Sequence, residues 1–150
     1  MQEFIDSYIA RHQSVLAQLA GCASDIEMMA HTCITALESG HKLLICGNGG
    51  SAADAQHMAA ELVGRFIADR PALAAIALTT DTSALTAIAN DYGYEDVFSR
   101  QVAGLARADD VLLAISTSGQ SASVLAACET ARSLGCKVVG LSGRDGGALR

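Results

Sequence analysis

A chain of 150 residues is the size of one ordinary domain, and its 51% hydrophobic and 17% charged residues exclude a disordered polypeptide. Sixteen acidic residues against ten basic ones give a net charge of −6, which disfavours non-specific binding to nucleic acids. The apolar runs at residues 42–46 and 111–115 are about five residues long, so they exclude a membrane span, which needs about 20. Residues 1–6 contain two acidic residues and no apolar core, which predicts no secretory leader.

The five cysteines form no C-x-x-C pair, and most of them lie in apolar stretches, where a thiol behaves as a small hydrophobic group. They are Cys22, Cys33, Cys46, Cys128 and Cys136. A reducing, cytoplasmic location is therefore expected. A catalytic thiol at Cys46, just before a glycine-rich loop, is the less favoured alternative.

Two helices are predicted at the start of the chain. Apolar residues recur at helical spacing over residues 4–19. A second helix is expected from Ser24, which forms a capping-box pattern with Glu27, to Gly40, a residue well suited to end a helix.

From residue 42 onward, short apolar runs alternate with helical stretches. The runs are residues 42–46, 74–78, 111–115 and 137–141, and helices are expected up to Leu62, over residues 83–89 and up to Leu134. This alternation predicts an α/β fold with a parallel sheet covered by helices on both faces. We expect a single domain over residues 1–150, with N-terminal helices in residues 1–40 and an α/β core in residues 41–150. A covering helix normally follows a fourth strand of this kind, so a C-terminal part is expected to be missing after Arg150.

The first strand is followed by a glycine-rich loop, Gly47-Asn48-Gly49-Gly50-Ser51-Ala52. A loop of this kind between a strand and a helix directs free backbone N–H groups toward an anion. It also matches a relaxed dinucleotide fingerprint, but that site requires an acidic residue about 20 positions further on. Here the second strand ends near Asp81, more than 30 positions on, and Asp69 falls in a turn. Dinucleotide binding is therefore the less favoured interpretation.

The third strand is followed by a second polar loop, Ser116-Thr117-Ser118-Gly119-Gln120-Ser121. Its four hydroxyl groups and backbone N–H groups can surround a phosphate monoester, and Ser121 can cap the next helix. A serine-rich turn with no ligand is the simpler alternative. Two such loops at the carboxyl ends of parallel strands favour a binding site, because ligands of open α/β sheets bind there.

His57 and Glu61 lie between these loops, four positions apart, which places them on one face of a helix. Such a pair can bind a metal ion or act as acid and base. Arg65, one turn further on, can pair with Glu61 and lower its pKa. A solvated helix face with an ordinary ion pair is the alternative.

Several strings occur in order along almost the whole chain: CGNGGS (46–51), DAQH (54–57), ELVGRF (61–66), ANDYG (89–93), ISTSGQSA (115–122) and GRDGG (143–147). Together they resemble the phosphosugar-binding SIS-domain isomerases. The resemblance implies a flavodoxin-like three-layer αβα sandwich with a parallel sheet. It also implies a homotetramer with sites at subunit interfaces and one zinc ion per subunit.

The resemblance implies a role for each matching residue. Asn48, Gly49 and Gly50 would hold the sugar, Asn90 and Asp91 would line the sugar site, and Ser116, Thr117, Ser118 and Ser121 would hold the phosphate. His57 and Glu61 would bind zinc, and Glu61 would also contact the substrate and act as the catalytic base. The family completes its zinc site and its second acid/base with a Gln and a His on a long final helix, so both are expected beyond Arg150.

The implied reaction is the aldose–ketose isomerisation of sedoheptulose 7-phosphate to D-glycero-D-manno-heptose 7-phosphate, the first step toward ADP-heptose and the lipopolysaccharide core. The enzyme class is an intramolecular oxidoreductase with a phosphosugar substrate, and no nucleic-acid or membrane partner is expected. The main alternative is a non-catalytic SIS-domain binding protein, of the type that associates with a replication initiator. Because such a protein has no need for the carboxylate of Glu61 or for the Asn90-Asp91-Tyr92-Gly93 turn, the isomerase is favoured.

Overall fold

The computed structural model describes residues 1–150, which divide into two compact units, Met1–Thr32 and Cys33–Arg150. The first unit is helical and contains α1 (Gln2–Gln18), the 3₁₀ turn η1 (Leu19–Cys22) and the start of α2 (Ala23–Glu38). The two helices predicted from the sequence are confirmed, and Gly40 follows the second with a left-handed φ of 82°. The single domain expected over residues 1–150 stays a prediction.

The capping box predicted at Ser24 is not formed. The 3₁₀ turn η1 runs directly into α2, and Ala23 already has helical angles. Ser24 therefore lies inside the helix, where its hydroxyl has no free N–H group to cap. No helix of the chain has the length and apolar character needed to cross a bilayer.

Four parallel strands form the sheet of the second unit, as the sequence predicts. They are β1 (Leu43–Gly47), β2 (Ala75–Ala77), β3 (Val111–Ser116) and β4 (Lys137–Ser142), in the order β2-β1-β3-β4. This is the order in which a flavodoxin-like sheet begins. Every residue of β1 and β3 is buried, because both strands lie in the middle of the sheet with helices over each face.

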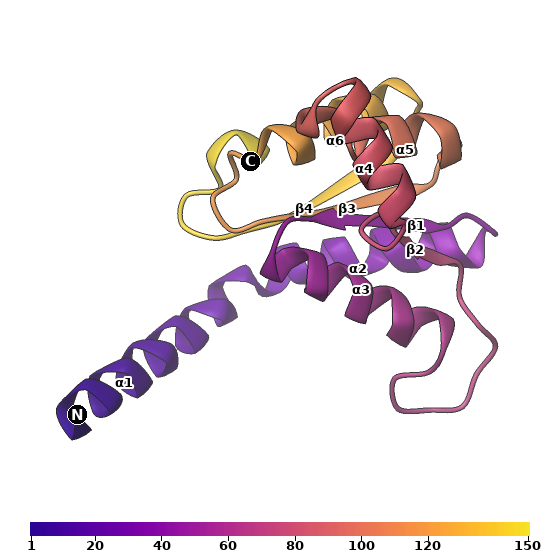
Figure 1. Ribbon diagram of the computed structural model, residues 1–150. Coiled ribbons are helices and arrows are strands. Elements are labelled where there is room, and N and C mark those ends of the chain that lie inside the picture. The colour runs from indigo at the N-terminus through magenta and orange to yellow at the C-terminus, as the bar shows by residue number, and fades with distance from the viewer. The chain divides into compact units, whose positions relative to one another are not determined.

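Helices cover the sheet on both faces, which confirms the three-layer αβα sandwich (Figure 1). On one face, α3 (Gly50–Val63) packs on β1 and β2. On the other face lie α4 (Thr82–Asp91), α5 (Ser99–Leu105) and α6 (Ala122–Ser133). The short helix α5 and the 3₁₀ turns η2 (Tyr94–Asp96) and η3 (Gly147–Leu149) were not predicted from the sequence.

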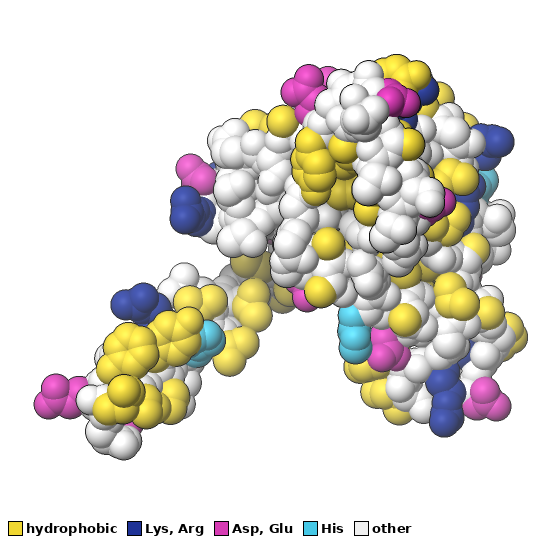
Figure 2. Space-filling model, in the orientation of Figure 1, with side chains coloured by type: hydrophobic (Ala, Val, Ile, Leu, Met, Phe, Trp, Pro, Cys, Tyr) yellow, Lys and Arg dark blue, Asp and Glu magenta, His cyan; other side chains and the backbone are white.

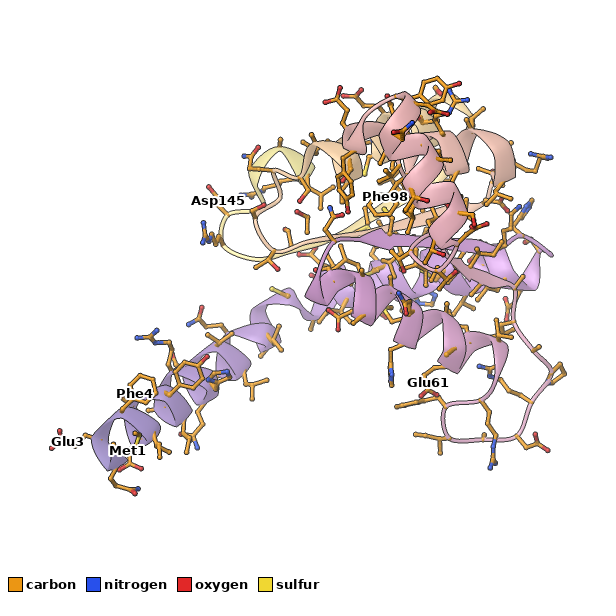
Figure 3. The ribbon with its side chains drawn as sticks, viewed as in Figure 1. Met1, Glu3, Phe4, Glu61, Phe98 and Asp145 are labelled. Atoms are coloured by element: carbon orange, nitrogen blue, oxygen red, sulfur yellow. The ribbon has the colours of Figure 1, made fainter.

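The main core lies between the sheet and α4, α5 and α6, where Figure 3 shows Phe98 pointing into the layer. Its strand side is formed by Leu44, Cys46, Leu112 and Ala114. Burial, together with the neighbouring thiol of Cys128, raises the pKa of Cys46 above its ordinary value. A buried thiol that stays protonated is a poor nucleophile, so Cys46 is a packing residue and not a catalytic one.

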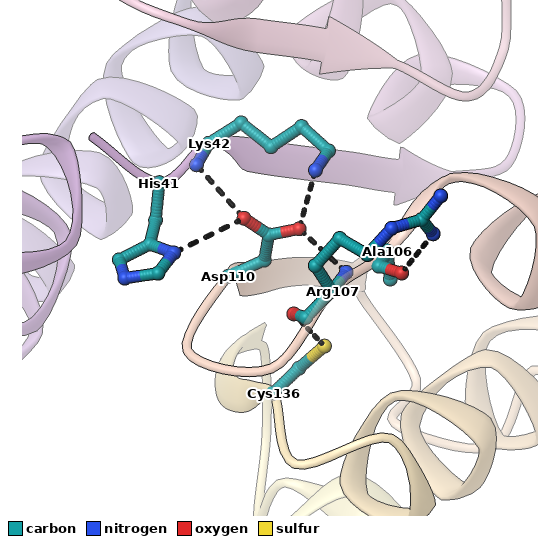
Figure 4. A network of polar contacts seen from close by, with 6 residues as sticks. All are labelled: His41, Lys42, Ala106, Arg107, Asp110 and Cys136. Carbon is teal, nitrogen blue, oxygen red and sulfur yellow. Dashed lines mark hydrogen bonds and ion pairs between the residues drawn. The ribbon is translucent and has the colours of Figure 1, made fainter.

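A buried carboxylate joins the amino-terminal ends of the strands (Figure 4). Asp110, whose side chain is 2% exposed, accepts hydrogen bonds from the backbone N–H and the ammonium group of Lys42. It also accepts one from the backbone N–H of Arg107 at 2.7 Å, and His41 Nδ1 lies 3.8 Å from it. The carbonyl of Asp110 accepts from the N–H of Lys137 at the start of β4. One residue therefore holds β1, β3 and β4 together at this edge.

Acid should weaken this junction. Burial alone would raise the pKa of Asp110, but the hydrogen bonds from Lys42 and Arg107 outweigh it and hold the pKa below its ordinary value. The contribution of Asp110 to stability is therefore complete above the unfolded-state pKa of about 3.9 and is lost as the pH falls through the lower folded-state pKa.

We expect Asp110→Asn to lower the free energy of unfolding at pH 7 by about 3 kcal/mol, because it leaves Lys42 without its anion and sets an amide N–H against the N–H of Arg107. Urea denaturation at pH 7 and at pH 3 measures this, and the difference from the wild type should shrink at pH 3. The control is Asp109→Asn at the neighbouring exposed acid, which should change stability by less than about 0.5 kcal/mol. Equal effects of the two substitutions would contradict this account.

Candidate functional site

The two polar loops lie at the carboxyl ends of β1 and β3, which are neighbours in the sheet. The chain leaves β1 toward β2 on one side, whereas β3 and β4 lie on the other side. This is the switch point of an open α/β sheet, the position at which such folds bind their ligands. The sequence prediction that the two loops belong to one site is consistent with this geometry.

The first loop needs glycine where it leaves β1. A Cβ atom on Gly47 would lie 2.8 Å from the Ser51 Cβ and 3.0 Å from the carbonyl oxygen of Ile115, so no side chain fits there. The next residue, Asn48, is held from two directions. Its amide group donates to Ser123 Oγ at 3.0 Å and accepts from the Tyr94 hydroxyl at 2.8 Å. These bonds fix the loop against α6 and η2.

The second loop presents hydroxyl groups and backbone N–H groups. Ser116 Oγ donates to Ser121 Oγ at 3.1 Å, and Ser118 Oγ accepts from the N–H of Gln120. Ser121 is the N-cap residue of α6, but its side chain makes no capping hydrogen bond. The first N–H groups of α6 therefore stay available, at the end of the helix that carries the positive part of its dipole. This arrangement suits an anion.

One pocket of about 320 Å³ joins the two loops. It is lined by Asn48, Ser51, Ile115, Ser116, Thr117, Ser118, Ser121 and Arg144. Five of the predicted site residues thus lie in one pocket, and they are Asn48, Ser116, Thr117, Ser118 and Ser121. Four serines, one threonine and one arginine give a lining rich in donors, with no acidic group to repel a phosphate.

His57 and Glu61 lie together on α3 but outside this pocket. His57 Nε2 is 3.5 Å from Glu61 Oε1, and the two side chains are 73% and 33% exposed. Both groups suit zinc, but the chain brings no cluster of three potential ligands together. The pair provides two donors and does not by itself complete a zinc site.

The expected pair of Glu61 and Arg65 is not formed. The helix α3 ends at Val63, so Arg65 lies beyond it and no longer follows the helical spacing. Another arginine, Arg70, folds back instead and donates to the carbonyl oxygens of Glu61 and Leu62 at 2.8 and 2.9 Å. These bonds satisfy carbonyl groups that the end of the helix leaves free.

Glu61 is far from the pocket along its own helix. It lies eleven residues after Gly50, which at a rise of about 1.5 Å per residue is about 16 Å. Figure 3 shows Glu61 near the carboxyl end of α3, on the side turned away from the strands. Within one chain, the hydroxyl-rich pocket and this carboxylate are therefore separate.

Asn90 and Asp91 end α4 and also lie outside the pocket. Their side chains bond to each other, with Asn90 Nδ2 donating to Asp91 Oδ1 at 2.7 Å. The Asn90-Asp91-Tyr92-Gly93 turn nevertheless serves the site indirectly, because the next residue is Tyr94, which holds Asn48.

Four polar residues at or next to the pocket were not predicted as site residues, namely Ser51, Tyr94, Ser123 and Arg144. Ser51 and Ser123 lie in the first turns of α3 and α6, so their closeness to the polar loops was a usable signal. Arg144 stands in the glycine-rich GRDGG string after the fourth strand, which was a signal of the same kind, whereas the folded chain alone brings the Tyr94 hydroxyl to Asn48.

Comparison with known proteins agrees with this architecture. A family model described as the SIS domain matches residues 7–143. The phosphoheptose isomerase of Akkermansia muciniphila is 51% identical over 150 residues, which cover 100% of this chain and 79% of the relative. That of Nitratiruptor sp. is 54% identical over 151 residues, covering 100% of this chain and 81% of the relative.

Two solved structures have the same fold as this chain. The phosphoheptose isomerase from Neisseria gonorrhoeae is 47% identical with a TM-score of 0.92, and the match covers 99% of this chain and 78% of that one. The one from Francisella tularensis is 42% identical with a TM-score of 0.95 and the same coverage. The family model, the relatives and the fold together show that this chain belongs to the SIS-domain family, among its phosphoheptose isomerases.

Proposed function

We propose that this protein is a sugar-phosphate isomerase that converts sedoheptulose 7-phosphate to D-glycero-D-manno-heptose 7-phosphate. The observation that carries the proposal is an identity of about half, over the whole chain, to phosphoheptose isomerases. The relatives favour this activity over the alternative of a non-catalytic binding protein. The product is a precursor for ADP-heptose and the lipopolysaccharide core.

The pocket at the switch point is the proposed phosphate site. Ser116, Thr117, Ser118 and Ser121 would bind the phosphate, with the N–H groups at the start of α6. Asn48, Gly49 and Gly50 would hold the sugar, because they lie at the adjacent loop, and Asn90 and Asp91 would line the sugar site. Support comes from the orientation of Asn48, which two hydrogen bonds fix.

Glu61 is the proposed base. The reaction removes a proton from carbon 1 of the ketose and delivers one to carbon 2 through an enediolate, so a carboxylate at the reacting carbons is required. Glu61 is half-buried next to His57, which can hold it in place. A base at this position also has to reach a sugar whose phosphate is bound in the pocket.

We infer that the Glu61 that acts on a sugar bound in this pocket comes from a second copy of the chain. A seven-carbon sugar with its phosphate is about 10 Å long, whereas about 16 Å of helix separates Glu61 from the start of α3. We therefore place the active site between subunits, with the phosphate loop of one chain and Glu61 of another. The homotetramer expected from the resemblance provides such interfaces.

The surface of α1 also supports assembly. This helix buries none of its residues and exposes a series of large apolar side chains, which Figure 2 shows along it. They include Phe4, Tyr8, Ile9, Val15 and Leu16. An apolar surface of this extent is typical of a contact with another protein. We assign it to subunit contacts, in a protein whose five free thiols fit a cytoplasmic location.

We also propose that His57 and Glu61 are two ligands of a zinc ion, whose further ligands do not belong to any cluster within residues 1–150. When bound, zinc supplies a positive charge beside developing oxyanions. Two donors are too few for a closed zinc site, which uses three or four protein ligands.

Replacing the proposed base should abolish most of the activity. Glu61→Gln keeps the shape of the side chain but cannot take a proton, so turnover should fall about 100-fold or more with the fold and assembly unchanged. Steady-state kinetics with sedoheptulose 7-phosphate measure this, and Glu129→Gln on the exposed surface of α6 is the matched control. Turnover within threefold of the wild type would remove Glu61 from the mechanism.

Zinc binding can be tested with two similar pairs. His57→Ala should weaken zinc binding by about tenfold or more, measured by competition with a chromophoric chelator. The control is His31→Ala, since His31 and Glu27 form a second exposed pair at the same spacing, 3.9 Å apart. If both substitutions weaken binding equally, the metal has no preference for His57 and Glu61, and the assignment fails.

A shared active site should allow two defective chains to complement each other. Ser118→Ala/Ser121→Ala removes two hydroxyl groups from the proposed phosphate site and should raise KM for the phosphosugar by about tenfold or more. Glu61→Gln lacks the base. At substrate concentrations well below the wild-type KM, the serine variant alone should show about a tenth of the wild-type rate or less, and Glu61→Gln alone about a hundredth or less.

Mixed subunits of the two variants should recover activity, because some interfaces then join an intact phosphate loop to an intact Glu61. A random one-to-one mixture should regain about a quarter of the wild-type rate under these conditions. The mixture is made by co-expression, and mixing after each variant has assembled is the control. No recovery in co-expressed, co-purified oligomers would place the whole site within one chain.

A further inference from the structure

The turn that follows β4 brings a cation to the pocket. Arg144 lines the pocket with the serines of the 116–121 loop and is the only charged residue in its lining. The chain as a whole carries a net charge of −6, which repels anions. A positive charge in this polar pocket creates a local site that attracts them.

The backbone of this turn is fixed to the phosphate loop. Gly143 donates from its N–H to the carbonyl of Thr117 at 3.2 Å, and Leu149 donates to the carbonyl of Gly119 at 3.1 Å. A Cβ atom on Gly119 would lie 1.8 Å from the carbonyl oxygen of Gly146, so the two segments touch through their main chains. Any shift of the loop therefore moves the base of the Arg144 side chain with it.

Arg144 has a backbone conformation that arginine rarely adopts. Its φ is 55°, in the left-handed region, where glycine, asparagine and aspartate are far more usual. Glycine adopts this conformation without strain. A long cationic side chain at position 144 costs conformational energy that a glycine would not, which points to a use for the side chain itself.

The guanidinium group has no partner within the chain. It forms neither an ion pair nor a hydrogen bond, and the neighbouring Asp145 carboxylate instead accepts from the N–H of Gly147 at 3.2 Å. The planar donors of arginine match the oxygens of a phosphate in a two-bonded geometry. The group is therefore free to bind one.

We propose that Arg144 binds the substrate phosphate together with the serine hydroxyls and provides the positive charge that distinguishes phosphorylated from unphosphorylated sugars. The inference rests on the proposed function for the identity of the sugar. It does not depend on Glu61 or on zinc. The other donors of the pocket are all uncharged.

Binding of inorganic phosphate tests the proposal without any need for turnover. By isothermal titration calorimetry, Arg144→Ala should raise Kd for inorganic phosphate by about tenfold or more, as expected for the loss of a charged contact. Arg144→Lys keeps the charge without the planar pair of donors, so its Kd should lie between the two. The matched control is Arg132→Ala, which removes the same charge from an exposed site on α6 and should leave Kd within twofold.

Kinetics provide the second measurement. Arg144→Ala should raise KM for the phosphosugar by a similar factor with kcat within threefold, because the contact holds the substrate and takes no part in proton transfer. Arg144→Gly relieves the backbone conformation, so it should keep the melting temperature of the wild type while showing the same loss of phosphate binding.

The outcomes separate this inference from the proposed function. If phosphate binding weakens but no variant, wild type included, isomerises the heptulose phosphate, Arg144 remains a phosphate ligand and the proposed reaction is wrong. If Arg144→Ala and Arg144→Gly bind inorganic phosphate as the wild type does, while Ser118→Ala/Ser121→Ala does not, the proposal for Arg144 is overturned.

Discussion

The parallel pairing of β1 with β3 is the constraint on which the site depends. Its register sets Leu43 opposite Val111 and Gly47 opposite Ile115, so the two strands end side by side. Two polar loops separated by about 70 residues of sequence thereby share one pocket. Because both strands are buried on both faces, a slip in register would break the fit of their side chains against the helices on each face, and the packed core therefore holds the site in place.

The regular elements could be predicted wherever local signals were strong. The strands β1 and β3 are short apolar runs that end at glycine or serine, and Gly40 and Gly135 end helices with left-handed φ angles of 82° and 80°. The helix α5 gave no such signal. It has seven residues and contains Gly104, and it is held by buried Val102 within the core, a contact that no local pattern reveals.

The part of the site that could be predicted is the part formed by loops directly after strands. The residues of the 116–121 loop and Asn48 could be identified because polar loops at the ends of parallel strands meet at one edge. Tyr94 could not, because its hydroxyl reaches Asn48 from a turn 46 residues away. The pairing of Glu61 with Arg65 failed for a local reason, since the helix ends between them. His57 and Glu61 were correctly placed on one helical face, at a distance from the pocket that helical rise determines.

The cysteines have a practical consequence for the study of this protein. Cys46, Cys128 and Cys136 are buried, and burial raises the pKa of each of these thiols, whereas Cys22 is exposed. An alkylating reagent therefore reacts with Cys22 in the native state, and with Cys46, Cys128 and Cys136 only when the core opens. Cys46 lies between the sheet and its covering helices, so the rate at which it is labelled measures how often the core opens. The native chain thus carries its own probe of core motion, and no engineered label is needed.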